Sequence, residues 1–357
     1  MAAALEIEGK NADDALVWTE AGLDFKAYYD KTDTSLLSKQ NNFQLSPSTD
    51  SFSGSRAWVN MPGIAVTNES EANANALTQL AAGADGILFD IRNHSKTNFD
   101  HLLNQIDWPY CSISFRANSN HSISESLSKY IQEKQYDSSV LTGTIFWDDA
   151  IEKNNLSGFD LFTLNKFQCF GLIILQSTTV KEISDALIKG MHLLDRLTQN
   201  GIAISTAIQK IAFSLPVSVN FFIEIAKLKA LRMLWFQIAR AYGQERYQPS
   251  NLHIHTRSEV WRKLEYQPNA NMLKSTTASL AAVLGGCNSL TVYAEDDSLM
   301  MNRIARNISS VMREESYIDK VADATSGAYA IEQMVDEIAK ASWLDFQQHV
   351  NDHEARF

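Results

Sequence analysis

Short apolar segments alternate with longer segments of helical periodicity from about residue 56 onward. Eight of the short segments read as strands: AWVNM (57–61), GILFDI (86–91), CSISF (111–115), VLTGTIF (140–146), FGLIILQ (170–176), QKIAFS (209–214), LHIHT (252–256) and SLTVYA (289–294). Helices are predicted over 69–82, ending at Gly83, over 179–200, ending at Gly201, and from Pro216 to Gly243. Strand and helix in regular alternation favour an α/β fold of the (β/α)8 TIM-barrel type, with an open doubly wound sheet as the alternative.

The alternation of side chains within four of these strands predicts an unusual barrel interior. Side chains alternate faces along a strand, and the outer face of a barrel must be apolar to pack on its helices. This places small hydroxyls, two histidines and two aromatic residues inside: Ser112, Ser114, Thr142, Thr144, Phe146, His253, His255, Ser289, Thr291 and Tyr293. Ordinary barrels fill this space with Val, Ile and Leu. The hydroxyl groups either line a passage for an elongated ligand or hydrogen-bond one another and buried water.

Composition limits the kind of partner. The chain has 357 residues, 45% of them hydrophobic, and a net charge of −11, which argues against nucleic acid because phosphate binding needs clustered Lys and Arg. The apolar runs fall far short of the roughly 20 residues that cross a bilayer, and the N-terminus lacks a basic region before an apolar one. We therefore expect a cytoplasmic protein without a membrane partner. Cys111, Cys169 and Cys287 are predicted to be buried thiols.

The chain divides into three predicted parts. Residues 1–50 mix polar stretches with isolated aromatic residues and are predicted to form an extended arm that packs either on a partner or on its own barrel. Residues 51–325 are predicted to form the barrel, and residues 326–357 a C-terminal helix.

Two pairs of residues are candidates for chemistry. His253 and His255 could bind a metal or move protons, but neither HxxxH nor HExxH occurs. The pair Asp148 and Asp149 follows a strand, where acids usually stabilise the start of a helix.

Two further pairs read as structural. Glu224 and Lys227, three residues apart, are predicted to form an ion pair. Gly285 and Gly286 precede the last strand and so lie at the end of a barrel that serves stability. No GxGxxG, P-loop or GxSxG motif is present. These residues alone name no reaction, no catalytic residue and no metal site.

Three long segments resemble the methylmalonyl-CoA mutase family: WTEAGLDFKAYYD (18–30), NFFIEIAKLKALRMLW (220–235) and RIARNISSVMREESYIDKVADATSGAYAIEQ (303–333). The resemblance implies a (β/α)8 barrel with a CoA ester along its axis between small hydroxyl side chains, followed by a flavodoxin-like domain that holds adenosylcobalamin. The family binds cobalt through a histidine in a DxHxxG motif, yet none of the eight histidines here has an Asp two positions before it. We expect no cobalamin-binding domain and no cofactor bound by this chain.

The sequence departs from the family where active members hold substrate. Where they carry RPWTIRQY, this chain reads RAWVNMPG, with Met61 at the Arg and Gly63 at the Tyr. Where they carry GTIQND, it reads GTIFWD, so that Phe146 replaces a substrate-binding Gln, and Leu156 stands at the Arg that pairs with the substrate carboxylate. Losing these groups should weaken binding of an acidic thioester by several kcal/mol.

A few binding residues are retained. HTRSEVW keeps the histidine of the family's HCQTSGW as His255, with Arg257 and Glu259 in place of smaller neighbours. In SLTVY, Thr291 replaces the histidine of SLHTN, and Lys274 replaces the CoA-facing Arg of NNIVR. The resemblance implies that His255, Lys274 and Ser289 are residual substrate-binding residues, with His255 a vestigial catalytic group.

The resemblance implies a small, non-catalytic subunit of an isomerase of propanoate metabolism. Its large subunit would carry adenosylcobalamin and interconvert methylmalonyl-CoA and succinyl-CoA, and the arm, with Trp18, Tyr28 and Tyr29, would wrap that partner. The alternative is an acyl-CoA-binding barrel, catalytic or sensing, that works with a separate cobalamin-binding chain. The sequence leaves open whether the isolated chain forms homodimers and whether the native product extends beyond residue 357.

Overall fold

A closed parallel barrel forms the centre of the computed structural model, which describes residues 15–20, 22–34, 45–48, 54–94, 96–119, 122–148, 163–260, 270–296 and 298–354. The strands follow the order β3-β11-β10-β9-β8-β7-β6-β5-β4, and every ladder between them is parallel. Their bounds are β3 Val59–Asn60, β4 Gly63–Ala65, β5 Gly86–Asp90, β6 Ser112–Ala117, β7 Gly143–Trp147, β8 Phe167–Ile173, β9 Ile211–Val217, β10 His253–Ser258 and β11 Ser289–Thr291. The predicted barrel is confirmed.

One short segment closes the barrel. β3 and β4 are consecutive parts of residues 59–65, separated by Met61 and Pro62. β3 pairs with β11, the last strand, while β4 pairs with β5. The Met61 amide donates to the Leu290 carbonyl, and the Pro62 carbonyl accepts from the Leu88 amide. This segment therefore occupies one of the eight strand positions, or staves, around the barrel. All eight predicted strand segments contribute to it.

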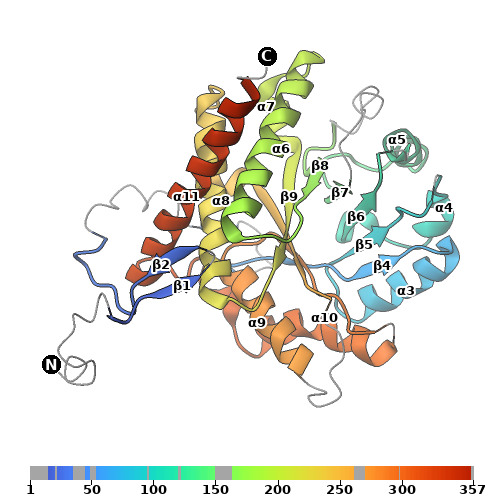
Figure 1. Ribbon diagram of the computed structural model, residues 1–357. Coiled ribbons are helices and arrows are strands. Elements are labelled where there is room, and N and C mark those ends of the chain that lie inside the picture. Colours follow the sequence, from blue (N-terminus) through green and yellow to red (C-terminus); the bar gives the residue numbers. More distant parts are fainter. Residues whose placement is uncertain are drawn as a thin grey trace.

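Helices follow the strands and cover the outside of the barrel (Figure 1). They are α3 Glu69–Ala81, α4 Phe99–Leu102, α5 Ile123–Glu133, α6 Thr179–Gln199, α7 Ile204–Ala207, α8 Phe221–Ala241, α9 Ala270–Leu284, α10 Leu299–Glu314 and α11 Tyr329–Glu354. The Asn68 and Thr178 side chains cap α3 and α6 by accepting backbone N–H groups. Gly83 and Gly201 follow these helices with positive φ, as predicted.

The predicted start of the third helix at Pro216 is wrong. Pro216 lies within β9 and pairs with Arg257 of β10, and α8 begins five residues later at Phe221. The strand tolerates the proline near its end, and the Pro216 carbonyl accepts a hydrogen bond from the Lys227 ammonium. The helix nevertheless ends before Gly243, which has a φ of 75°.

Strand alternation sorts the side chains as predicted. The outward residues Ile113, Phe115, Leu141, Ile145, Ile254, Leu290 and Val292 belong to the large apolar core between barrel and helices. Phe146 points inward, whereas Trp147 belongs to the outer core, where its indole N–H donates to the Cys169 carbonyl at 2.9 Å. Cys169 and Cys287 are buried free thiols, but Cys111 is partly exposed, contrary to the prediction.

The N-terminal and C-terminal parts of the described chain lie together. Figure 1 shows α11 alongside α6 and α8, with which it packs. The two-stranded sheet β1 (Trp18–Glu20) and β2 (Leu23–Phe25) contacts α11. The remainder of the predicted arm lies partly outside the described residues, and the proposed division at residues 325 and 326 remains a prediction. Within the described part of the chain, no helix has the length and apolar character needed to span a bilayer.

Candidate functional site

An apolar layer crosses the inside of the barrel toward its C-terminal mouth. Met61, Leu88, Phe146 and Ile173, from four different strand positions, form an interior cluster separate from the outer core. Each is at most 5% exposed. Gly171 makes room for this layer because it has no side chain. A Cβ at this position would lie 2.4 Å from the Phe146 ring. Phe146 thus fills the axis of the barrel at the level of this layer.

His255 lies directly against this layer, and both nitrogens of its ring are engaged. Its Nδ1 lies 2.8 Å from Ser214 Oγ and its Nε2 lies 3.0 Å from Thr291 Oγ1. Thr291 donates its single hydroxyl hydrogen to the Met61 carbonyl at 2.7 Å, so it accepts from His255 Nε2–H. Nδ1 must then accept from the Ser214 hydroxyl. The contacts fix a neutral imidazole in the Nε2–H tautomer.

Burial keeps the two interior histidines uncharged. Burial lowers the pKa of His255 well below its usual value, and the positive charge of Arg257 lowers it further. Burial together with Arg232 lowers the pKa of His253 to about 4. His253 Nε2 lies 3.0 Å from Ser289 Oγ. Neither ring is placed to carry a charge at neutral pH.

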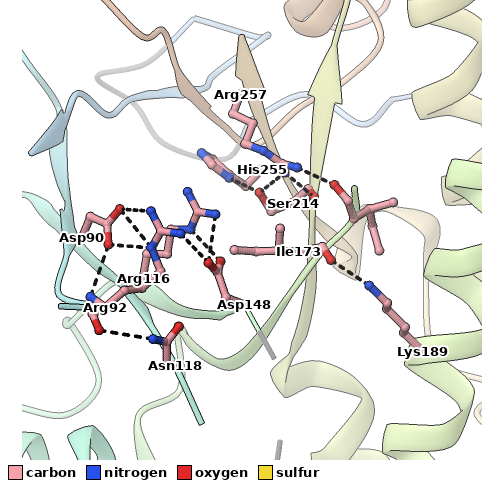
Figure 2. Close-up of polar contacts among 11 residues, drawn as sticks. Asp90, Arg92, Arg116, Asn118, Asp148, Ile173, Lys189, Ser214, His255 and Arg257 are labelled. Atoms are coloured by element: carbon pink, nitrogen blue, oxygen red, sulfur yellow. Dashed lines mark hydrogen bonds and ion pairs between the residues drawn. The ribbon is translucent and has the colours of Figure 1, made fainter. Parts of the chain in front are cut away.

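Arg257 ties the end of β10 across the mouth to β8 and β9. Its Nη1 donates to the Ser214 carbonyl at 2.7 Å and to Ser214 Oγ at 2.9 Å, and its Nη2 donates to the Ile174 carbonyl (Figure 2). Glu259 accepts from the Gln176 amide, which follows β8. Both residues that replace smaller family neighbours therefore bind strand ends within the same chain.

A charged network lies on the other side of the mouth (Figure 2). Arg92 binds Asp90 through two nitrogens, and its Nη1 lies 2.6 Å from Asp148 Oδ2. Arg116 binds the same Asp148 carboxylate through Nε at 2.7 Å and Nη2 at 3.1 Å. Burial alone would raise the pKa of Asp90, but its hydrogen bonds to Arg92 and the charge of that residue outweigh burial and lower the pKa.

This network was not found from the sequence. The sequence predicts Asp148 to be a helix-start residue, but its carboxylate holds together Arg92, which follows β5, and Arg116, near the end of β6. The available signal was the position of these residues at C-terminal strand ends, which meet at one edge of the barrel. Asp149 and Leu156, the other residues predicted near this strand, lie outside the described residues.

A second buried charge cluster lies behind the mouth. Lys227 Nζ lies 2.7 Å from Glu182 and 2.5 Å from Glu224, which confirms the predicted ion pair and adds a carboxylate from α6. All three side chains are at most 5% exposed. Glu182 also accepts the Ser177 amide and Glu224 the Ser218 hydroxyl, so the cluster fixes the loops after β8 and β9.

The structure brings together two of the three predicted substrate-binding residues. His255 and Ser289 are register partners on β10 and β11, and both are almost fully buried. Lys274 instead lies on α9, outside the strand ring, and is half-buried. The described residues contain no group of three or more His, Cys, Asp or Glu side chains arranged to hold a metal.

Several interior hydroxyls hydrogen-bond histidine, amide and backbone groups of the same chain. Besides the contacts of Ser214, Ser289 and Thr291, the Ser114 hydroxyl accepts from the Thr144 amide at 3.0 Å, and Thr144 donates to Gln168 at 3.3 Å. Of the two interpretations of the hydroxyl lining, these contacts favour hydrogen bonding inside the barrel over an open passage, with histidine, amide and backbone groups as the partners.

The chain is similar in sequence to methylmalonyl-CoA mutases. Residues 175–353 match the family model described as methylmalonyl-CoA mutase. The methylmalonyl-CoA mutase small subunit of Porphyromonas gingivalis is 26% identical over 96% of this chain and 60% of its own length. The methylmalonyl-CoA mutase of Rhizobium meliloti is 24% identical over 95% of this chain and 56% of its own length. The chain thus spans about three fifths of these relatives. A solved dihydropteroate synthetase superposes with a TM-score of 0.42 at 15% identity, covering 84% of this chain and 98% of its own, a likeness too weak to indicate function.

Proposed function

Because this chain belongs to the methylmalonyl-CoA mutase family, we propose that it is the small, non-catalytic subunit of a heterodimeric, cytoplasmic mutase. In this proposal the large subunit binds adenosylcobalamin and interconverts methylmalonyl-CoA and succinyl-CoA, while the present chain binds and stabilises the large subunit. The name of the P. gingivalis relative, a small subunit that matches 96% of this chain, supports the assignment.

The filled axis carries the proposal. A CoA ester threaded along the barrel would have to displace Phe146, which is 1% exposed and packs with Met61, Leu88 and Ile173. A buried carboxylate beside this layer would lose its hydration, which is strongly unfavourable. The Arg257 guanidinium near His255 already donates to Ser214 and to the Ile174 carbonyl. Arg92 and Arg116, the cations on the other side of the mouth, already bind Asp90 and Asp148.

The existing hydrogen bonds of His255 oppose its use in binding a substrate. To hydrogen-bond a thioester carbonyl, it would have to release Nε2–H from Thr291. That change would also leave the Thr291 hydroxyl, which is fully buried, without its incoming donor. His255, Ser289 and Lys274 are therefore proposed as remnants of a binding site, not as catalytic residues.

The described residues do not fit adenosylcobalamin. Both ring nitrogens of His255 are already bonded, to Ser214 and Thr291, and Nε2 of His253 is bonded to Ser289. The ion pairs of Arg92, Arg116 and Asp148 occupy the mouth. We therefore derive no step through this cofactor on this chain and assign it to the partner.

Part of the N-terminal segment is free to reach a partner. Phe25 and Tyr29 are buried within the chain, so Tyr29 does not join the predicted partner-binding aromatic residues. Tyr28 is 74% exposed, and Trp18 is exposed on one side while it packs on Phe25 with ring centroids 5.0 Å apart. These two aromatic residues are proposed to contact the large subunit.

Reconstitution tests the proposal. The chain is purified alone and together with a methylmalonyl-CoA mutase large subunit, and isomerisation is measured with added adenosylcobalamin. We expect turnover only when the large subunit is present, a stable complex of the two chains, and unchanged turnover after His255→Ala.

A matched titration separates this function from the acyl-CoA-binding alternative. Calorimetry with methylmalonyl-CoA on the isolated chain should give no micromolar binding signal. Micromolar binding that is lost in His255→Ala would support the binding barrel instead. A complex whose turnover falls on replacement of His255 would also contradict a non-catalytic role.

A further inference from the structure

A small groove opens between the first turns of α9 and α10, beside the end of β11. Its wall consists mainly of apolar side chains from these helices and from the segment after β11, among them Met272, Val292, Met301, Ile304 and Ile308. α9 and α10 pack against each other below it. The groove has a volume of about 40 Å³, while a single water needs roughly 10–15 Å³ on the same measure. It therefore has room for an aliphatic stem but not for a nucleotide.

Large apolar side chains surround the groove on the protein surface. Leu273 is 65% exposed, Leu299 is 87% exposed and Met300 is 60% exposed. They lie in the first turns of the same two helices that form the groove. Isolated exposed apolar residues are ordinary, but several at one opening indicate a surface that a protein partner covers.

One carboxylate oxygen within the groove lacks a counterpart. Glu295, which follows β11, lines the groove, and its Oε1 atom is buried without a hydrogen-bond partner among the described residues. A buried carboxylate oxygen in apolar surroundings is unfavourable unless a donor, best a cationic one, reaches it. The groove therefore combines an apolar wall with a buried carboxylate oxygen to which a positively charged donor could bind.

We propose that this groove docks a lysine or arginine side chain of the large subunit, with the apolar rim packing around it. The methylene stem of such a side chain matches the apolar wall, and its charged end matches Glu295. A buried anchor surrounded by apolar contacts that exclude water is the usual arrangement at a binding hot spot. A free amine would leave the rim of Leu273, Leu299 and Met300 in water, so a protein surface fits better. This inference rests on the proposed function and names the surface that serves it.

The test measures the affinity of the full-length chain for a purified large subunit by biolayer interferometry. Glu295→Gln keeps the shape of the side chain and removes its charge, and Ala294→Phe adds bulk at the groove wall. We expect each to weaken binding at least about tenfold, because each removes a buried charge-assisted contact or its space. Asp296→Asn makes the same charge change on the adjacent exposed residue and should change the affinity less than about twofold.

The outcomes separate the two proposals. Thermal unfolding of each variant within a few degrees of the unchanged chain excludes misfolding as the cause. If the large subunit binds but Glu295→Gln and Asp296→Asn behave alike, the groove inference is wrong and the proposed function stands. If the unchanged chain does not bind the large subunit at all, the proposed function fails, and the groove inference fails with it.

Discussion

Phe146 lies against His255 inside the barrel, with the two ring centroids 4.6 Å apart. Phe146 thereby covers one side of the imidazole, while Ser214 and Thr291 bind its two nitrogens. His255, proposed above as a remnant of a binding site, is thus held by neighbours within its own chain. The tautomer and charge of His255 follow from these contacts.

His255 should remain neutral and protonated at Nε2 in mildly acidic solution. Burial and the nearby Arg257 lower its pKa well below the ordinary value of about 6.5. The measurement is long-range ¹H–¹⁵N NMR of the histidine side chains between pH 7.5 and 5. We expect no titration of His255 in the folded chain and ordinary titration in urea. A His255 that titrates near pH 6.5 when folded would contradict the hydrogen-bond chain described above.

Phe146→Ala should strongly destabilise the chain. The substitution removes a fully buried phenyl ring and leaves a space beside Met61, Leu88 and Ile173, which typically costs about 3–5 kcal/mol in the free energy of unfolding. Urea denaturation gives the difference. Phe222→Ala is the matched control, since Phe222 is 55% exposed and its loss should cost less than about 1 kcal/mol. Equal effects of the two changes would mean that the axis is not packed.

Lys227→Met should destabilise the chain most at neutral pH. Removing the cation leaves the Glu182 and Glu224 carboxylates buried together, and breaking a buried pair costs about 3–5 kcal/mol. Burial already raises the pKa of Glu182, and without Lys227 this pKa rises further. The folded variant then binds protons more readily than the unfolded chain, so its stability increases as pH falls through the raised pKa. Urea denaturation at pH 7.5 and 5.5 should show a smaller deficit at the lower pH; a pH-independent deficit would contradict this account.

His253 should make the chain less stable in acid. The pKa of His253 is about 4 in the folded chain and about 6.5 in the unfolded chain. Between these pH values the unfolded chain binds more protons, so the free energy of unfolding decreases as the pH is lowered. The ring is partly exposed, and we expect a loss of roughly 1–3 kcal/mol between pH 7 and 4 from this residue. His253→Gln should reduce the slope of stability against pH in that window. An unchanged slope would show that His253 is protonated in the folded chain.

Much of the barrel was predictable because strand alternation is a local property. The inward set containing Ser114, Thr144 and Thr291 followed from the apolar residues between them, and the structure confirms it. The helix start predicted at Pro216 was wrong because proline, although common in the first turn of helices, also occurs near the end of a strand. There its missing N–H removes few hydrogen bonds from the sheet.

The site itself depends on contacts between distant segments. Arg92 and Arg116 meet Asp148 only because three strand ends converge, and the Arg–Asp contacts span 56 and 32 residues. Glu182 likewise joins Lys227 across 45 residues. No spacing rule within one helix or strand predicts such pairs. Lys274, which the resemblance names as a substrate-binding residue, lies on α9 outside the strand ring, and its binding role stays a prediction.

The closing stave of the barrel has a consequence for biosynthesis. Residues 59–65 emerge early from the ribosome, but the Met61 carbonyl meets its Thr291 donor only after 230 further residues have been made. Until then the early strand presents an open edge, a state prone to pairing with other chains. Nascent copies should therefore depend on chaperones for most of translation, and a truncation that removes β11 should aggregate during synthesis even though the other seven staves are intact.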